Sequence, residues 1–273
     1  MTKAKINEYF VQYLPISEKG RKISVPRWRI VKAILYKLKT GIQWENLPMR
    51  EFFGFTRYSR ESVYYHYNRW CKSEAWSKIY RELLKNKKQY LDMSSINLDG
   101  SHTPVKRGGE QVGYQGRKKT KTTNMLILTD NQGVPLAWSE PISGHHNDSY
   151  ELEKTASKIF DDMEGMGFCC KGLFLNGDAG FDVNVFRALC YTKHIIPNID
   201  KNKRRGIKEN NSDMYVFDPQ LYKRRFVVEQ LNAWVDGFKT LIMRYETSSR
   251  NWMQLHCMAF AIVFLRKYKL IEF

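Results

Sequence analysis

The chain has 273 residues, of which 42% are apolar and 14% aromatic, so it can bury a hydrophobic core and is not disordered throughout. Its charge is unbalanced: 45 Lys and Arg against 28 Asp and Glu give a formal net charge of +17. Residues 1–90 carry 20 basic and 7 acidic side chains (20 − 7 = +13), which leaves +4 for residues 91–273. This asymmetry favours a polyanionic partner and predicts a nucleic-acid-binding domain at 1–90, followed by a different domain at 91–273.

Membrane, secreted and zinc-ribbon proteins are excluded by other features of the sequence. The first residues lack the apolar core of a signal peptide, and the longest apolar stretch, Met258 to Leu265, is far shorter than the ~20 residues of a membrane span. Five cysteines without a Cys-x-x-Cys pair argue against a disulfide framework or a structural zinc site. We therefore expect a protein of a reducing cytoplasm, with no membrane partner.

Helices separated by turns are predicted in the basic region. Apolar residues from Trp28 to Lys39 recur at steps of three and four, with Pro26 before them and Gly41 after them, as helix ends prefer. Ser59 can cap a second helix that runs to about residue 71, and a third helical stretch covers 76–84. The first third of the chain is therefore predicted to be all α-helical.

The second of these helices carries a set of polar side chains suited to DNA. In a helix-turn-helix, such residues contact phosphates and base edges in the major groove. A small helical bundle with a solvated basic face would show the same pattern, and His66 by itself could be half-buried. The candidate DNA-binding residues are Arg60, Tyr65, His66, Asn68, Arg69 and Lys72.

A mixed α/β pattern follows. The predicted order is β-β-β-α-β-α-β-α, in which an antiparallel hairpin is joined to a parallel half. A helix is predicted to begin at Asp148 and another at Asp182. The predicted strands are 96–99 (ended by Gly100), 124–129, 134–139, 173–175 (ending at Gly177-Asp178) and 195–196.

Two carboxylates are predicted to follow the carboxyl ends of separate strands. Asp99 and Asp178 each have a glycine neighbour, which lets backbone or ligand approach closely. Ligands of open α/β sheets bind outside these strand ends. Each Asp alone could equally be a turn residue or a helix cap.

A third carboxylate lies in a predicted helix from Tyr222 to Ile242. Apolar residues at 227, 231, 234, 238 and 241 form one stripe, and Tyr222, Arg225 and Glu229 begin a second, polar stripe. The helix therefore presents a hydroxyl, a guanidinium and a carboxylate along one face. The alternative is a solvated face with an Arg225–Glu229 ion pair worth a few tenths of a kcal/mol.

In this order and spacing, the residues resemble bacterial insertion-sequence transposases of the Asp-Asp-Glu type, specifically insertion-sequence family five. The resemblance covers about 26–265 and includes Leu98-Asp99-Gly100-Ser101, Asp178-Ala179-Gly180-Phe181-Asp182 and a Tyr-x-x-Arg-x-x-x-Glu signature at 222–229. Related signatures carry a lysine where this chain has Asp236, so Lys239 is the candidate substitute for a phosphate contact. Where relatives often show His-Asp, the chain has Asn147-Asp148.

The resemblance implies a ribonuclease H-like mixed sheet flanked by helices, preceded by an all-α, helix-turn-helix-like domain. Asp99, Asp178 and Glu229 are then the expected catalytic residues and ligands of two Mg²⁺ ions, which Mn²⁺ can replace. Tyr222 and Arg225 are expected to support catalysis by contacting phosphate. The implied partners are double-stranded DNA, as element ends and as target, and a second copy of the chain in the synaptic complex. The implied location is the bacterial cytoplasm, on the nucleoid.

Two functions from other classes remain compatible with these residues. A metal-dependent nuclease of ribonuclease H-like fold would use the same carboxylates but would not rejoin DNA. A non-catalytic DNA-binding protein derived from a transposase would use only residues 1–90. The intact Asp99, Asp178 and Glu229 argue against the second alternative, and a strand-transfer assay separates the first from a transposase.

Overall fold

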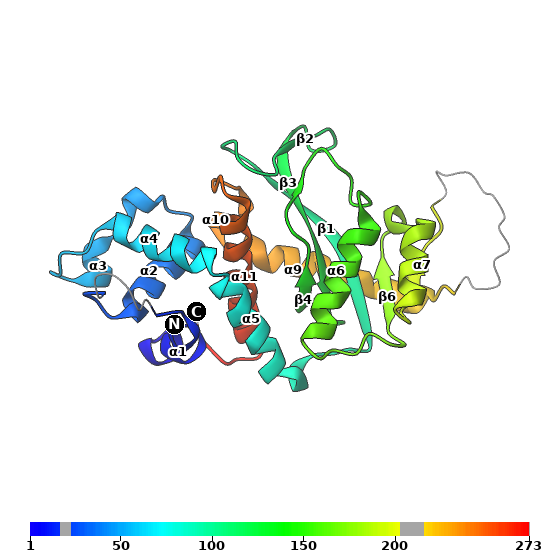
Figure 1. Cartoon of the computed structure of the whole chain (residues 1–273), viewed down its shortest axis with the longest axis horizontal. Helices are drawn as coiled ribbons and strands as arrows, with labels where there is room; N and C mark the ends of the chain where they lie inside the picture. Colours follow the sequence, from blue (N-terminus) through cyan, green and yellow to red (C-terminus); the bar gives the residue numbers. More distant parts are fainter. Residues whose placement is uncertain (17–22, 203–215, 273) are drawn as a thin grey trace. The chain divides into compact units, whose positions relative to one another are not determined.

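The computed structural model describes residues 1–16, 23–202 and 216–272, which fall into two compact units (Figure 1). The helical unit comprises Met1–Asn86, Pro104–Glu110 and Trp234–Phe273. The sheet unit comprises Lys87–Thr103 and Gln111–Ala233. The first segment of the helical unit ends at Asn86. The last forty residues, however, pack with the first segment rather than with the sheet.

Helices make up the first unit. The long ones are α2, α4, α5 and α11, and the two caps predicted from the sequence are present: Gly41 ends α2 in a left-handed conformation (φ 73°), and the Ser59 hydroxyl accepts a hydrogen bond from the Ser62 N–H at 3.1 Å. The elements are α1 (Lys3–Tyr9), η1 (Val11–Tyr13), α2 (Arg27–Thr40), η2 (Trp44–Asn46), α3 (Met49–Phe53), α4 (Arg60–Lys72), α5 (Ala75–Asn86), α10 (Lys239–Ile242) and α11 (Ser249–Lys267).

Helix α11 explains why the C-terminal segment belongs to this unit. Every residue from Asn251 to Leu265 is buried, and a helix that is apolar on all sides must be surrounded by other elements. It packs against α4 and α5, where Tyr80 and Phe260 lie with ring centroids 5.9 Å apart. The buried Tyr67 hydroxyl donates to the Asn251 carbonyl at 2.7 Å. Within the described residues, α11 and the other helices are too short or too polar to cross a bilayer.

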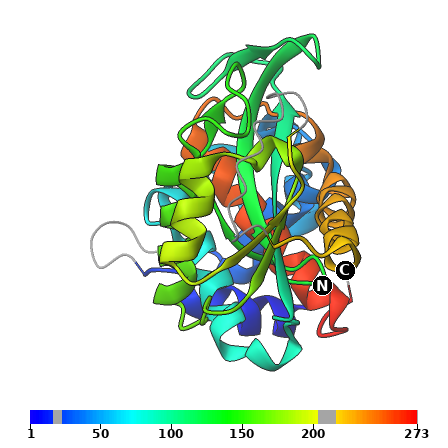
Figure 2. The same cartoon turned by 90° about the vertical axis from the view of Figure 1, so that its right-hand side faces the viewer.

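The second unit is a mixed sheet with helices on both faces and the strand order β2-β3-β1-β6-β7 (Figure 2). Strands β1, β6 and β7 are parallel neighbours, and the antiparallel hairpin of β3 and β4 extends the sheet on the other side. The elements are η3 (Lys88–Tyr90), β1 (Ser95–Pro104), β2 (Gly113–Gln115), β3 (Thr120–Thr129), β4 (Pro135–Trp138), β5 (Ile142–Ser143), α6 (Leu152–Gly165), β6 (Phe174–Gly177), η4 (Ala179–Phe181), α7 (Asn184–Thr192), β7 (Ile196–Ile199), α8 (Pro219–Tyr222), η6 (Lys223–Phe226) and α9 (Val227–Asp236).

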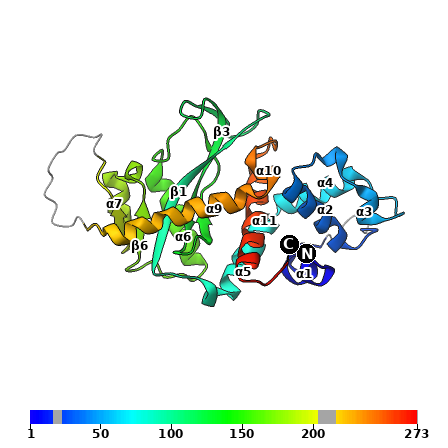
Figure 3. The same ribbon diagram turned by 180° about the vertical axis from the view of Figure 1, so that it is seen from behind.

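The two faces of the sheet are covered by different helices. Figures 2 and 3 show α6 and α7 on one face and α9 along the other. The last three residues of α9 already belong to the helical unit. A buried ladder of asparagines joins the parallel strands: Asn176 donates to Asn97 at 2.9 Å, and Asn198 donates to Asn176 at 2.7 Å. These bonds satisfy polar groups that burial would otherwise penalise.

Two sequence predictions of where an element ends or begins are wrong. Strand β1 does not stop at Gly100 but continues to Pro104, so Asp99 lies within the strand. Helix α6 begins at Leu152 rather than at Asp148, after Glu151 in a left-handed conformation (φ 45°). Strands β2 and β5 were also not predicted, and each is only two or three residues long.

The predicted continuous helix over 222–242 is also wrong, because it is divided into α8, η6, α9 and α10. The chain leaves α9 at Gly237, and η6 has the tighter winding of a 3₁₀ turn. The buried stripe of α9 consists of Val228, Leu231 and Val235, whereas Trp234 is 36% exposed. The buried residues are therefore 228 and 235 instead of the predicted 227 and 234, whereas Leu231 is buried as predicted.

Candidate active site

Two carboxylates lie side by side on neighbouring parallel strands of the sheet unit. Leu98 of β1 pairs with Gly177 of β6, so the next residues along the two chains are Asp99 and Asp178. Adjacent strands run about 4.8 Å apart, which places these two aspartates next to each other across the sheet. Asp178 is exposed and directly follows β6, as predicted from the sequence. The register of β1 and β6 therefore brings together residues 79 positions apart.

The environment of Asp99 is crowded with negative charge. Burial, and to a smaller extent the neighbouring Asp148 and Asp178, raise the pKa of its carboxyl to about 6. A backbone hydrogen bond at Gly100 and the Arg225 guanidinium act in the opposite direction. A carboxylate in such surroundings is stabilised when a cation joins it. The site is therefore suited to a positively charged ligand.

Asp148 is a functional candidate that sequence reasoning missed. Its Oδ1 accepts a hydrogen bond from the Asn124 side-chain amide at 2.7 Å and lies 3.4 Å from His102 Nε2. Burial would raise the pKa of Asp148, but these hydrogen bonds outweigh that effect and hold the pKa below its usual value. The carboxylate lies so close to Gly100 that a Cβ there would collide with it.

The contact explains the glycine beside Asp99. Asp148 reaches the strand only because residue 100 has no side chain. The sequence signal was present, since Asn147-Asp148 occupies the place where relatives show His-Asp, but the residue was interpreted as a helix start. Its Asn124 partner is fully buried on β3, so Asp148 is held in place by the sheet.

Arg225 approaches the same carboxylates from the segment before α9. Its guanidinium stacks on two rings, 5.3 Å from the Tyr222 centroid and 4.8 Å from that of Phe226. Its Nε is buried and, among the residues that the structure describes, finds no hydrogen-bond acceptor. Burial raises the pKa of Tyr222, with Asp178 and Asp200 adding to the rise and Arg225 opposing it. Tyr222 and Arg225 thus lie near the aspartates, although they are not on α9.

Glu229 is placed differently from the aspartates. It is exposed in the first turn of α9, beside the buried Val228. Among the described residues, no three His, Cys, Asp or Glu side chains come close enough together to hold one metal ion. The structure thus brings Asp99 and Asp178 together but does not assemble a three-carboxylate site with Glu229.

The aspartates nevertheless provide the donors that a divalent cation needs. Carboxylate oxygens are the ligands that Mg²⁺ prefers, and Mg²⁺ keeps part of its water shell rather than requiring a complete protein cage. The pKa of Asp99 is raised mainly by burial and to a smaller extent by Asp148 and Asp178, and a bound cation would stabilise its charged form against both effects. Asp99 and Asp178 therefore fit a divalent metal ion as a pair of ligands.

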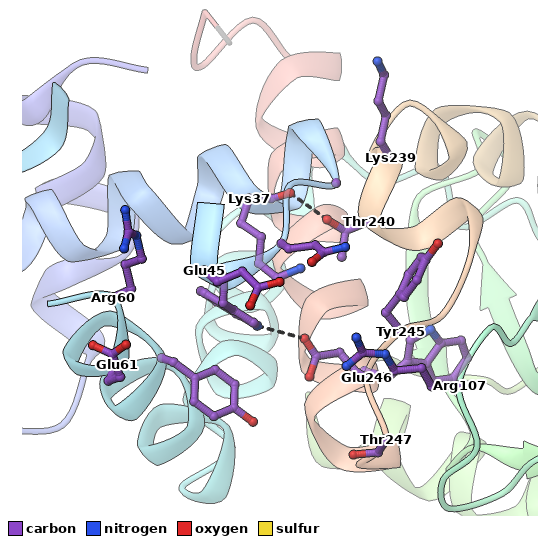
Figure 4. A pocket seen from close by; sticks show the side chains of 15 residues that line it. Lys37, Glu45, Arg60, Glu61, Arg107, Lys239, Thr240, Tyr245, Glu246 and Thr247 are labelled. Carbon is purple, nitrogen blue, oxygen red and sulfur yellow. Dashed lines mark hydrogen bonds between the residues drawn. The ribbon is translucent and has the colours of Figure 1, made fainter. Parts of the chain in front are cut away.

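The remaining predicted support residue, Lys239, belongs to the helical unit. It lies at the start of α10, after the break at Gly237, and is exposed. Lys239 lines a cavity of that unit (Figure 4). Asp236, which replaces the signature lysine, is the last residue of α9 and is also exposed.

The predicted DNA-binding residues of α4 divide into exposed and packed side chains. Arg60, Tyr65 and Lys72 are exposed, and Arg69 is half-buried. Asn68 accepts a hydrogen bond from the Asn251 amide at 3.1 Å, so it takes part in helix packing. His66 does not lie on the exposed polar side as expected: it is 8% exposed, and burial lowers its pKa.

Comparison with known proteins gives two family matches. A family described as "Putative transposase of IS4/5 family" matches residues 5–80, and a family described as "Transposase DDE domain" matches residues 91–264. No curated protein matches the chain.

Among solved structures, the chain is similar to three complexes of one transposase. The first is a Mos1 paired-end complex with the left transposon end, at 10% identity and a TM-score of 0.29, with 90% of this chain and 80% of that chain covered. The second is a pre-cleavage Mos1 transpososome, at 10% identity and a TM-score of 0.30, with 100% of this chain and 94% of that chain covered. The third is a Mos1 paired-end complex with Mn, at 9% identity and a TM-score of 0.31, with 89% of this chain and 79% of that chain covered.

Proposed function

The chain belongs to the IS4/5 transposases and carries their DDE domain, and we propose that it binds the terminal inverted repeats of its own insertion sequence and catalyses DNA cleavage and strand transfer. The observation that carries this proposal is the parallel register that sets Asp99 beside Asp178. It supplies two carboxylates on a rigid sheet, where catalytic groups are held most accurately.

The aspartates are assigned as ligands of divalent metal, on which transposase DDE domains typically depend. Two Mg²⁺ ions, replaceable by Mn²⁺, would lower the pKa of the attacking water and stabilise the leaving oxygen at a phosphodiester. Asp99 and Asp178 would bind the ions through their carboxylate oxygens, and Asp148 adds negative charge beside them. Glu229 is assigned as the third carboxylate, brought in when DNA and metal are bound.

Arg225 and Tyr222 are assigned to the DNA phosphate. The guanidinium is stacked on rings, has a buried Nε without an acceptor and interacts electrostatically with Asp99. A phosphate oxygen would satisfy this donor, and a guanidinium can bind phosphate bidentately. Arg225 would thereby orient the scissile phosphate over the aspartates.

The helical unit is assigned to DNA recognition. Residues 1–90 hold 13 of the 17 net positive charges, and Arg60, Arg69 and Lys72 present cations on α4. Phosphate contacts of this kind supply most of the affinity of DNA-binding proteins. Two element ends must be held together for transposition, so we also propose that two copies of the chain act in the synaptic complex.

The test is a cleavage and strand-transfer assay with the full chain, Mg²⁺ and DNA carrying the inverted repeats that flank the gene. The wild type is expected to release a 3′-hydroxyl at the element end and to join it to target DNA. Asp178→Ala should abolish both steps while retaining end binding, whereas Glu153→Ala, which removes an exposed carboxylate on α6, should change neither. Cleavage without joining would identify a nuclease, and cleavage by Asp178→Ala would refute the assigned site.

A further inference from the structure

A lysine of the helical unit is buried without a hydrogen-bond acceptor. Lys37, on α2, is only 5% exposed, and among the described residues its Nζ donates no hydrogen bond and forms no ion pair. Its ammonium lies 5.0 Å from the centroid of the Trp44 ring. Burial lowers the pKa of Lys37, which Glu246 partly offsets. The side chain is thus largely desolvated while its ammonium faces the cavity over the Trp44 ring, where it is available as a donor.

Glu246 lies across from this lysine without reaching it. Its Oε1 accepts a hydrogen bond from the Trp44 indole N–H at 3.3 Å, which is drawn as a dashed line in Figure 4. Glu246 interacts electrostatically with Lys37, but no ion pair joins the two within the described residues. The Lys37 ammonium and the Glu246 carboxylate therefore stay apart. A ligand between them could accept a hydrogen bond from the first and donate one to the second.

Both side chains line a cavity of about 500 Å³, which we call the Lys37 cavity (Figure 4). This volume lies in the range of small-molecule sites. Its lining includes the aromatic rings of Tyr64 and Tyr245, on which a planar ring can stack, and the Trp44 ring that the Lys37 ammonium already covers. All of the lining residues belong to the helical unit.

The charges of the lining restrict the chemistry of the occupant. Arg60 and Arg107 bring cations to the cavity, while Glu45 and Glu61 join Glu246 as carboxylates. Three carboxylates disfavour a bare phosphate or sulfate, and the buried Lys37 disfavours a basic peptide. A nucleotide offers an uncharged, planar base for the interior and a phosphate for the two arginines.

We infer that the Lys37 cavity binds one unpaired guanine base of DNA. Guanine presents a carbonyl acceptor, O6, beside two adjacent donors, N1–H and N2–H₂. Lys37 donates to O6, and the Glu246 carboxylate accepts from the two donors. Extruded bases are recognised in this way, through the Watson–Crick edge and by stacking on aromatic rings. The choice of DNA as the source of the base rests on the proposed function.

The inference is tested by binding assays with the full chain in EDTA, so that cleavage plays no part. The probes are one duplex with a short single-stranded 3′ overhang that ends in guanine, the same duplex ending in an abasic site, and free dGMP as competitor. The wild type is expected to bind the guanine overhang at least tenfold more tightly than the abasic one. Free dGMP should compete only weakly, because it lacks the contacts of the duplex.

The variants Lys37→Met and Glu246→Gln are each expected to remove this preference without changing affinity for the abasic probe. Lys32→Met is the matched control, because Lys32 is an exposed lysine of the same helix outside the Lys37 cavity. Lys37→Met keeps most of the side-chain volume and removes a buried charge, so its thermal unfolding temperature should not fall, which verifies that it folds.

Three results would overturn the inference. They are equal affinity of the wild type for both overhangs, an equal loss on both probes in Lys37→Met, which would indicate a phosphate contact, and competition by dGMP as strong as that of the guanine overhang, which would indicate a free-nucleotide site. End cleavage with Mg²⁺ is measured separately on the same preparations. Failure of base binding is thereby distinguished from failure of the proposed transposase activity.

Discussion

The two units bury charges of opposite sign. In the sheet unit the group is the half-buried Asp99 carboxyl, whose pKa is raised to about 6, mainly by burial and less by two neighbouring aspartates. In the helical unit it is the Lys37 ammonium, whose pKa is lowered by burial. Neither charge is compensated by a described ion pair. Each desolvated charge lowers the stability of the folded chain. A ligand that brings an opposite charge or a hydrogen-bond partner offsets this cost.

The two sites are assembled by different means. Asp99 and Asp178 are brought together by the parallel register of β1 and β6. The Lys37 cavity needs segments from both ends of the chain: the hydrogen bond between Trp44 and Glu246 spans 202 residues. The comparison teaches that an acidic site on a sheet can be inferred from its strands, whereas a cavity among helices depends on the packing of the whole unit.

The largest expected effect tests whether the C-terminal helix completes the helical unit. Phe260 is fully buried on α11 against Tyr80, so Phe260→Ala should lower the free energy of unfolding by about 3–5 kcal/mol. Phe55→Ala, at a position that is 90% exposed in the same unit, should cost little. Chemical denaturation measures both, and a loss below about 1 kcal/mol in Phe260→Ala would contradict the assignment of α11 to this core.

The second prediction tests whether the Arg225 guanidinium of the sheet unit contacts DNA phosphate. Arg225→Lys keeps the charge but loses the bidentate geometry, so end cleavage should slow at least tenfold, which corresponds to about 1.4 kcal/mol of barrier. Thermal stability should remain unchanged. Arg224→Lys, at an exposed neighbouring arginine of η6, serves as the control. Unchanged cleavage in Arg225→Lys would assign Arg225 to surface electrostatics, which contribute about 0–1 kcal/mol.

A third prediction uses the titration of Asp99 in the metal-free protein. Its folded pKa, about 6, is above the value near 3.9 of an unfolded chain. The contribution of this group to stability is therefore full below about pH 4 and is lost as the pH rises through 6.

Asp99→Asn should accordingly unfold at a higher temperature than the wild type at pH 7.5, with a smaller difference at pH 5. Added Mg²⁺ should stabilise the wild type more than the variant, because a ligand that binds only the folded state shifts the equilibrium. Melting curves at the two pH values test this, and a variant less stable than the wild type at pH 7.5 would contradict it.

The smallest effect sharpens the assignment of DNA contacts to α4. If Lys72 contacts one phosphate, Lys72→Gln should reduce the slope of log K against log salt by about 0.9. Lys85→Gln removes a lysine that is already paired with Glu82 at 3.2 Å and should leave the slope unchanged. Titrations of end DNA at several salt concentrations measure both. Identical slopes for Lys72→Gln and the wild type would remove Lys72 from the interface.

Part of the candidate site was predictable because its residues lie in short sequence motifs. Asp178 after β6, the caps of α2 and α4 and the parallel β6 follow from local rules, and the structure confirms them. Asp148 was misinterpreted, because its contact with Gly100 joins β1 to the segment before α6. Such a contact leaves no periodic trace in either segment.

The helix after residue 222 shows the same limit. An unbroken 3.6-residue period predicted one helix, but the chain winds tightly at η6 and turns at Gly237, so the buried face shifts to Val228 and Val235. Two adjacent apolar residues occur at 227–228 and again at 234–235, and either residue of each pair fits a helix face. Only packing in the folded chain selects which of the two is buried. Glu229 stays on the polar side of the helix, where it is exposed.

The sequence by itself determined the class of most segments, the charge asymmetry and the family, because hydrophobic period, capping residues and motif spacing are local properties. Only the tertiary structure decided which segments share a unit and which charges become buried. Helix α11 joins α4 and α5 because a helix that is apolar on all sides finds enough cover only there. The same packing encloses Lys37 and turns an ordinary helix lysine into a buried donor, since burial is a property of neighbours that are distant in the chain.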